Sequence, residues 1–213
     1  MIIIRHARSL YNLRKSESLD SPISEFGKIQ ASGVGKFLQK KFPEISTQYV
    51  CYTSPFLRCL QTANYIQKTF GVNNFSCSKA DNYFLRVKIL PELSEHLELD
   101  QKVAIPRREE SFPDFIWGDY KETVFAAQKN QEFLERVVKA KDIIVNETSN
   151  EYIKPLIITH GTTKNTLIKL ITEKVNHVPV WDFSYDNCSI SWIQDGRLVW
   201  NGRNLHHEPE AGY

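Results

Sequence analysis

The sequence of 213 residues has no long hydrophobic run and almost no net charge, and each shortage excludes a class of protein. No apolar stretch approaches the roughly 20 residues of a membrane-spanning helix, and the N-terminus lacks the charged-then-apolar pattern of a signal peptide. The formal net charge is only +2, and no block of Lys and Arg resembles a nucleic-acid-binding arm. We therefore expect a cytoplasmic protein that has neither a membrane nor a nucleic acid as its partner.

The sequence also lacks the usual motifs of disulfide-rich, metal-binding and cofactor-binding proteins. The four cysteines show no CxxC spacing, and we expect them to be reduced and mostly buried: Cys51, Cys59, Cys77 and Cys188. His96 and the pair His206-His207 have no third donor at ligand spacing, so we expect no metal site. There is no glycine-rich loop of the P-loop or dinucleotide type, and we expect no cofactor.

The sequence does contain short apolar runs that alternate with stretches of helical period. The predicted strands are residues 2–4, 49–53, 87–93 and 156–159, and the predicted helices cover 24–41, 55–71, much of 121–145 and the residues after 163. Asp195-Gly196 between two apolar runs predicts a hairpin over 188–200. This order predicts an α/β fold with a mostly parallel sheet and a C-terminal antiparallel hairpin. With no repeat and no linker, residues 1–213 are predicted to form a single domain.

Two of the helices carry explicit start signals. Ser24 is the predicted N-cap of the first helix, and Ile29 is predicted to face the core. Ser54 is the predicted N-cap of the second helix, with Pro55 at the first helical position. That start places Arg58 in the first helical turn, beside the carboxyl end of the strand at 49–53.

The first strand is followed at once by groups that bind anions and transfer protons. Arg5 and Arg8 each offer a planar guanidinium that matches phosphate or carboxylate oxygens. His6 lies between them and can act as a nucleophile or carry a proton, because its free pKa lies near neutrality. Ser9 and Asn12 add a hydroxyl and an amide. In an open α/β sheet ligands bind at the carboxyl ends of the strands, where this cluster is predicted to lie.

Three further predicted strand ends carry groups of the same kind. Arg58, Glu95 and His160 each lie at or just beyond the carboxyl end of a predicted strand. Convergence of these groups with Arg5 and His6 describes a phosphoryl-transfer site without a metal, in which arginines neutralise the phosphoryl oxygens. A neutral histidine can be the nucleophile, and a carboxyl group can protonate the leaving oxygen.

In this arrangement the sequence resembles the histidine phosphatase superfamily, also called phosphoglycerate-mutase-like. The family's opening Arg-His-Gly-Glu-Ser-x-x-Asn is similar to Arg-His-Ala-Arg-Ser-x-x-Asn at 5–12. Its Asp-x-Pro-Leu-Thr-x-x-Gly-x-x-Gln-Ala resembles residues 20–31, and its Ser-Pro-x-x-Arg-x-x-Gln-Thr-Ala is met in full by residues 54–63. Leu-x-Glu and the second His-Gly match 93–95 and 160–161, so the motifs occur in the family's order along the chain.

The resemblance implies a three-layer α/β/α fold and a phosphohistidine intermediate on His6. It implies that Arg5, Arg58 and His160 hold the phosphoryl group and that Glu95 is the general acid and then the base. With Ser9, Asn12 and Arg8 as further predicted phosphate contacts, the expected enzyme is a metal-independent phosphomonoesterase of the histidine acid phosphatase type. Its substrate is expected to be a phosphorylated small molecule or a phosphopeptide.

Two departures and several alternatives accompany this resemblance. Ala7 replaces the family's glycine, so the turn after the first strand is expected to differ, and Arg8 replaces its usual glutamate. Glu92 is an alternative to Glu95 as the acid. A cofactor-dependent phosphoglycerate mutase, with Arg107-Arg108 in place of a mutase arginine pair, and a phospho-ligand or protein-binding module without catalysis remain alternative functions.

Overall fold

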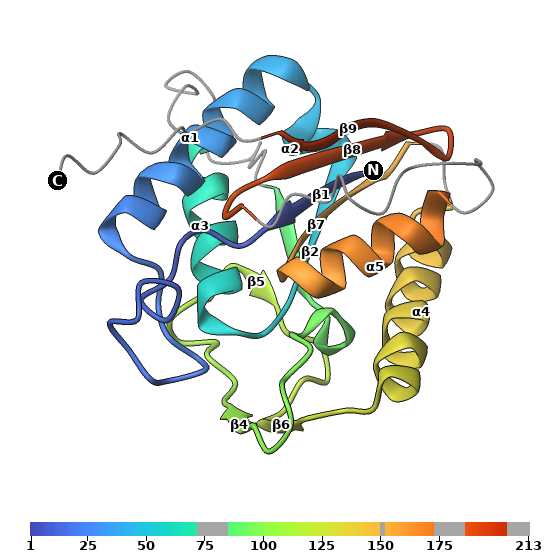
Figure 1. The fold of residues 1–213 in the computed structure, drawn as a ribbon. Coiled ribbons are helices and arrows are strands. Elements are labelled where there is room, and N and C mark those ends of the chain that lie inside the picture. Colours follow the sequence, from blue (N-terminus) through green and yellow to red (C-terminus); the bar gives the residue numbers. More distant parts are fainter. Residues whose placement is uncertain (72–84, 150–151, 173–185, 204–213) are drawn as a thin grey trace, which may run out of the picture.

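The computed structural model describes residues 1–71, 85–149, 152–172 and 186–203 of the protein (Figure 1). Cys77 and the pair His206-His207 lie outside these residues. The main sheet contains β1 (Ile2–Arg5), β2 (Tyr49–Thr53), β3 (Arg86–Ile89), β5 (Phe115–Ile116), β7 (Lys154–Thr159), β8 (Ile190–Gln194) and β9 (Arg197–Arg203). Their order across the sheet is β5-β3-β2-β7-β1-β8-β9. The first five of these are parallel to one another, while β8 is antiparallel to β1 and β9 to β8.

Helices cover both faces of the sheet, which makes the fold a three-layer α/β/α arrangement (Figure 1). The helices are α1 (Glu25–Lys41), α2 (Ile45–Gln48), α3 (Leu57–Gly71), α4 (Asn130–Glu147) and α5 (Gly161–Thr172), with a short 3₁₀ helix η1 (Pro91–Leu93). Helices α1 and α3 pack together on one face, and α4 and α5 pack together on the other. The predicted fold class is confirmed.

The first strand shows why the sheet lies in the centre. Ile2 and Ile4 join the apolar core on the α1/α3 side, whereas Ile3 joins the core on the α4/α5 side. All three side chains are completely buried. Since burying an isoleucine contributes about 1.5–3 kcal/mol, this short run alone stabilises the fold by several kcal/mol in gross terms. A strand buried on both faces is also what the unbroken β-branched run predicts.

Helix α1 begins after Ser24, as predicted, and the Ser24 hydroxyl accepts a hydrogen bond from the Gly27 amide at 3.0 Å. The prediction for Ile29 is wrong, because its side chain is 62% exposed. At about 100° per residue, Ile29 points roughly 180° away from Leu38, which is buried. The close approach at Gly27 is specific, since a β-carbon there would collide with the carbonyl oxygen of Arg8.

Helix α3 begins at Leu57, later than predicted, and Ser54 is not its cap. The Leu57 amide instead donates to Oδ1 of Asp20 over 2.7 Å. The Ser54 hydroxyl lies 3.0 Å from Nε2 of His160, so it belongs to the site below. Arg58 still falls in the first turn of the helix, as the sequence predicts.

Two other predicted boundaries are corrected by the structure. The strand predicted over 87–93 ends at Ile89, because Pro91 has no amide hydrogen to donate and begins η1 instead. The helix predicted over much of 121–145 covers Asn130–Glu147. Before it, β6 (Thr123–Ala126) pairs antiparallel with β4 (Lys102–Ile105) in a separate two-stranded ribbon. Alternating burial along 123–126 is typical of a strand, not of a helix.

The C-terminal hairpin forms as predicted. Asp195 and Gly196 both have positive φ angles, 51° and 71°, which suits a tight turn between two antiparallel strands. Among the described residues no helix is long and apolar enough to cross a membrane. The assignment of residues 1–213 to a single domain stays a prediction.

Candidate active site

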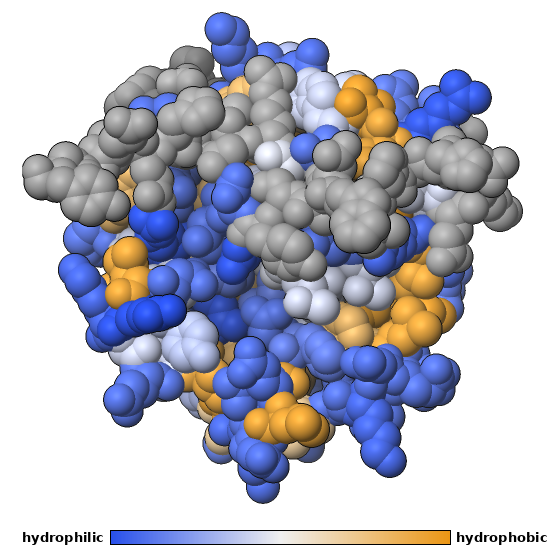
Figure 2. All heavy atoms as spheres, in the orientation of Figure 1, coloured by the Kyte–Doolittle hydropathy of each residue, from blue (hydrophilic) through white to orange (hydrophobic). Residues whose placement is uncertain are grey.

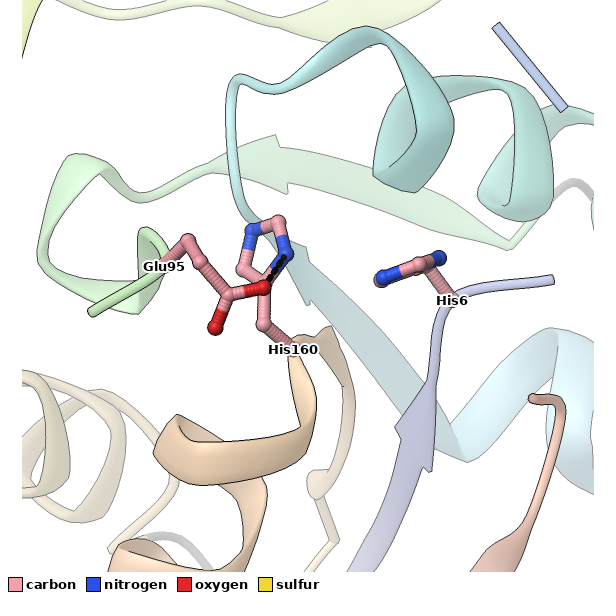
Figure 3. A group of neighbouring side chains, drawn as sticks. All are labelled: His6, Glu95 and His160. Atoms are coloured by element: carbon pink, nitrogen blue, oxygen red, sulfur yellow. Dashed lines mark ion pairs between the residues drawn. The ribbon is translucent and has the colours of Figure 1, made fainter. Parts of the chain in front are cut away.

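The carboxyl ends of β1, β2 and β7 bring four of the predicted residues together. His6 follows β1, Arg58 lies in the first turn of α3 after β2, and His160 follows β7. Glu95 follows η1, which continues from β3. The rings of His6 and His160 have centroids 5.3 Å apart, and Glu95 lies against His160 on the side away from His6 (Figure 3). The predicted convergence of strand ends at one site is therefore confirmed.

His6 is held in one tautomer. Its ring is 1% exposed, and Nδ1 lies 2.8 Å from the carbonyl oxygen of Ala7. Because a carbonyl only accepts, Nδ1 carries the hydrogen and Nε2 keeps a free electron pair. Burial, together with the charge of Arg58, lowers the pKa of His6 well below its usual value. A neutral imidazole with Nε2 unprotonated is the form that can attack phosphorus.

Arg58 is the centre of the site's hydrogen bonds. Its Nε lies 3.2 Å from Nε2 of His6, and its Nη2 lies 3.4 Å from Oε2 of Glu95. The guanidinium is buried, and its Nη1 donates to the carbonyl oxygen of Leu19. Asp20 accepts from the first amide of α3 and pairs with Arg108 in a largely buried ion pair. These contacts fix the helix start from which Arg58 reaches His6.

Nδ1 of His160 and Oε2 of Glu95 lie 3.1 Å apart, a contact that becomes an ion pair only when the imidazole is protonated (Figure 3). Nη2 of Arg58 lies 3.1 Å from the same Nδ1, and the Ser54 hydroxyl lies 3.0 Å from Nε2, so both ring nitrogens of His160 have polar partners. Burial lowers the pKa of His160 to about 4, against the raising effect of Glu95.

The carboxyl of Glu95 is ionised at neutral pH. Burial alone would raise its pKa, but His160 and the guanidinium groups of Arg58 and Arg5 lower it to about 2. A general acid must be protonated, so the free site is not yet in the state that protonates a leaving group. A phosphate dianion placed between Glu95 and the arginines offsets their charge and thereby raises the pKa of Glu95.

The predicted phosphate contacts divide into two sets. Arg5 and Asn12 line the cleft, and Nε of Arg5 is buried without a hydrogen-bond partner. Oδ1 of Asn12 already accepts from Ser9 and Asn187, which leaves the Asn12 amide hydrogens for an anion. Ser9 is fully buried and orients Asn12 rather than lining the cleft. Arg8 does not line the cleft either, and its guanidinium lies 5.9 Å from the ring centroid of Phe26.

The cleft has a volume of about 240 Å³, and charged, polar and apolar residues line it. The candidate site residues among them are Arg5, His6, Asn12, Arg58 and Glu95. The other lining residues are Tyr11, Leu19, His96, Leu97, Glu98, Gln101, Gly161 and Thr162. On the face shown in Figure 2 hydrophilic side chains prevail, and apolar side chains form small separate groups.

The ligand atoms of His6, Glu95 and His160 all lie within 4.8 Å of one another, a spacing that a metal ion could bridge. Two guanidinium groups, however, face the same space, because Arg58 contacts all three residues and Arg5 lines the cleft. Two fixed positive charges repel a divalent cation and attract an anion. The arrangement therefore suits a phosphoryl group better than a metal.

Ala7, which stands where the resembled family has glycine, fits its turn without a left-handed backbone conformation. The Ala7 backbone does not adopt a positive φ, its carbonyl holds Nδ1 of His6, and its amide donates to Oγ1 of Thr62 at 2.9 Å. Its methyl group is completely buried in the core on the α1/α3 side. An alanine therefore performs the same backbone role here without strain.

The chain is similar to known proteins in sequence pattern and in fold. The family model of the histidine phosphatase superfamily (branch 1) matches residues 1–202. The chain therefore belongs to the histidine phosphatase superfamily. A search of curated proteins found no match.

Several solved structures are similar over almost the whole chain. The ecdysone phosphate phosphatase of Bombix mori in complex with tungstate has 17% sequence identity and a TM-score of 0.71, with 100% of this chain and 96% of that chain covered. A mycobacterial glucosyl-3-phosphoglycerate phosphatase complexed with VO3 has 16% identity and a TM-score of 0.58, with coverages of 95% and 99%. A protein histidine phosphatase complexed with tungstate has 16% identity and a TM-score of 0.55, with 93% of each chain covered. At such identities the likeness shows the fold.

Sequence reasoning missed several residues around the site. Asn187 donates to the carbonyl oxygen of His6 at 3.1 Å, and no motif pointed to it. Arg136 of α4 donates to three carbonyl oxygens of the segment that carries Glu95. The one available signal for Arg136 was its place between Phe133 and Val137 on the apolar side of a predicted helix, where an unpaired charge is costly.

Proposed function

We propose that the protein is a metal-independent phosphomonoester hydrolase that acts through a phosphohistidine on His6. The observation that carries the proposal is the state of this histidine: it is buried, neutral, and tied through Nδ1–H to a backbone carbonyl so that Nε2 faces Arg58. The similar solved structures that are phosphatases, some in complex with tungstate or VO3, support it. The finer class, a cytoplasmic enzyme of the histidine acid phosphatase type, belongs to the same proposal.

The reaction proceeds in two balanced steps. Nε2 of His6 attacks phosphorus, the bond to the ester oxygen breaks, and that oxygen takes a proton from Glu95. Water then loses a proton to Glu95 and attacks phosphorus, the P–N bond breaks, and phosphate leaves neutral His6 behind. Arg5, Arg58 and His160 hold the phosphoryl oxygens during both steps, which lowers the energy of the charged transition state.

Glu95 is a better candidate for the acid than Glu92. Oε2 of Glu95 contacts both Arg58 and His160, and Glu95 lines the cleft. Glu92 instead pairs with Lys139 of α4 at 2.7 Å, and it does not line the cleft. Only the first of these carboxyls can reach a leaving oxygen on a phosphoryl group held by Arg58.

The surroundings of Arg107 and Arg108 favour hydrolysis over a mutase reaction. Arg107 donates to the carbonyl oxygens of Gly118 and Tyr120, and Arg108 pairs with Asp20. Neither arginine lines the cleft, so neither is placed to bind the carboxylate of a phosphoglycerate. The cleft is also lined by Tyr11, Leu97 and Gln101, which suit a leaving group with an apolar face and hydrogen-bonding atoms, on a small molecule or a phosphopeptide.

The test is turnover with trapping of the intermediate. In EDTA the protein is expected to hydrolyse p-nitrophenyl phosphate, and rapid quenching without acid is expected to trap an acid-labile phosphoenzyme. His6→Ala is expected to abolish the label and nearly all turnover. The control is His96→Ala, which is expected to keep the label, because Nε2 of His96 faces the carbonyl of Gln128.

Two results contradict the proposal. A label that persists in His6→Ala moves the nucleophile elsewhere, with His160 as the next candidate. A protein that binds phosphate but turns over no phosphomonoester is a binding module, the alternative that needs neither nucleophile nor acid.

A further inference from the structure

The backbone around Glu95 is held by side chains at four consecutive carbonyl groups. Arg136 donates from Nη1 to the carbonyl oxygens of Glu92 and Ser94, both at 2.8 Å, and from Nη2 to that of Glu95 at 3.1 Å. The carbonyl oxygen of Leu93 accepts from Oγ1 of Thr159 at 2.6 Å. Each of these four carbonyl groups accepts a hydrogen bond from a side chain of α4 or β7, and these bonds hold the segment in place.

Arg136 is itself fixed before it reaches this segment. Its Nε donates to Oε1 of Gln128 at 2.8 Å, and its guanidinium lies 5.3 Å from the ring centroid of Phe133. Burial lowers the pKa of Arg136 to about 10, which leaves it charged near neutral pH. A planar guanidinium can reach three carbonyl oxygens at once, whereas an ammonium group on a flexible stem cannot hold them in one plane.

We propose that Arg136 is a positioning residue that acts through Glu95. By fixing the carbonyl groups on both sides of Glu95, it sets the point from which the carboxyl group reaches the leaving oxygen. Proton transfer requires the two heavy atoms to approach to about 2.6–3.2 Å, and a displacement of about 1 Å can cost about 10²-fold in rate. This inference rests on the proposed function, because it presupposes that Glu95 is the general acid.

The experiment compares two leaving groups. An alkyl phosphate needs the acid, whereas p-nitrophenolate leaves almost without a proton. Arg136→Lys keeps the charge but loses the planar fork, and it is expected to lower kcat/KM for the alkyl phosphate by about 10–100-fold. For p-nitrophenyl phosphate the expected loss is below about 3-fold. The ratio kcat/KM is the right readout, because it reports the first, phosphorylating step.

The matched control is Lys139→Gln on the same helix. Lys139 reaches the same segment, but through the side chain of Glu92 and from a position that is 68% exposed. Its loss is expected to leave both rates within about 2-fold, since exposed ion pairs contribute little.

A double variant separates positioning from a general loss of structure. In a Glu95→Gln background, Arg136→Lys is expected to add no further loss on the alkyl phosphate, because the two residues act as one unit. Losses that multiply would overturn the proposal, as would equal losses of Arg136→Lys on both substrates. If Arg136→Lys does not fold, Thr163→Val removes the 2.8 Å hydrogen bond to the Ser94 carbonyl and is expected to show a smaller loss with the same preference.

The same data distinguish this inference from the proposed function. If Glu95→Gln shows the selective loss and neither Arg136→Lys nor Thr163→Val does, positioning is refuted and the acid role of Glu95 stands. If Glu95→Gln itself loses equally on both substrates, the assignment of the acid fails.

Discussion

Nε–H of Arg58 donates to Nε2 of His6 over 3.2 Å, so it occupies the electron pair with which His6 would attack phosphorus in the proposed mechanism. Binding of a phosphoryl group requires this hydrogen bond to be exchanged for one to a phosphoryl oxygen. The exchange keeps the number of hydrogen bonds constant while it frees Nε2 for attack. In the proposed mechanism Arg58 therefore orients His6 before binding and neutralises phosphoryl charge afterwards.

The different roles of Arg58 and Glu95 predict different dependence on the leaving group. Glu95→Gln is expected to lose about 10²–10⁴-fold in kcat/KM on an alkyl phosphate, the range of general acid catalysis, and much less on p-nitrophenyl phosphate. Arg58→Ala is expected to weaken both substrates alike, because it stabilises phosphoryl charge whatever leaves. The measurement is kcat/KM for the two substrates with each variant. Equal losses for Glu95→Gln would remove it from the acid role, and Glu92 would be tested next.

The sequence predicted the parts of the site that depend on strand order. Each of His6, Arg58 and His160 follows a buried strand, and parallel strands bring their carboxyl ends to one edge of a sheet. The motif that begins at Ser54 also pointed to Arg58, which lies against His6 and Glu95, although the predicted capping role of Ser54 was wrong. Its hydroxyl contacts His160, more than 100 residues along the chain. No local pattern can report a competition between a cap and a partner so distant in sequence.

The parts that sequence could not predict are those decided by tertiary contacts. The sequence predicted a helix over much of 121–145 and no strand in this range, but β6 forms at 123–126 because β4 offers it a partner strand. Arg136 looked like an ordinary helical charge, and its three carbonyl partners become adjacent only when α4 packs against η1. Ile29 was misplaced for a simpler reason: at about 100° per residue it lies on the side of α1 opposite the buried Leu38.

The structure of the turn at Ala7 predicts that the family's glycine is not needed here. Ala7→Gly is expected to leave kcat/KM within about 3-fold, because the carbonyl that holds His6 belongs to the backbone. The free energy of unfolding is expected to fall by about 1 kcal/mol, from the lost methyl burial and the added freedom of the unfolded chain. Denaturant unfolding and steady-state kinetics measure the two effects. A large drop in kcat/KM with little loss of stability would show that the methyl group itself shapes the site.

The lowered pKa of Glu95 predicts that anion binding takes up a proton. At pH 7 the carboxyl is ionised in the free protein, because its pKa is about 2. A bound dianion offsets the charges of Arg5 and Arg58, so the pKa of Glu95 rises and the complex binds more protons than the free protein. Calorimetric titration with tungstate in buffers of different ionisation enthalpy measures this uptake. Glu95→Gln is expected to abolish it, and an uptake that persists would assign the proton to a histidine.

The lowered pKa of the buried Lys164 predicts how the free energy of unfolding depends on pH. The side chain is fully buried on α5, its Nζ donates to Oγ of Ser189 at 2.7 Å, and burial together with the charge of Arg5 lowers its pKa to about 7, while Asp186 opposes the shift. Between pH 7 and about 10.5 the unfolded chain therefore binds more protons than the folded one, so the free energy of unfolding rises with pH.

Lys164→Met is expected to remove this rise, which has a slope of up to about 1.4 kcal/mol per pH unit. Denaturant unfolding at several pH values between 7 and 10 measures the slope for the wild type and the variant. The matched control is Lys36→Met at an exposed position of α1, which is expected to keep the wild-type slope. The wild type and Lys164→Met share every other titrating group, so a difference between their stability curves is due to Lys164. Parallel curves for Lys164→Met and the wild type would show that this lysine stays charged in the folded protein, with a charged partner in place of the Ser189 hydroxyl alone.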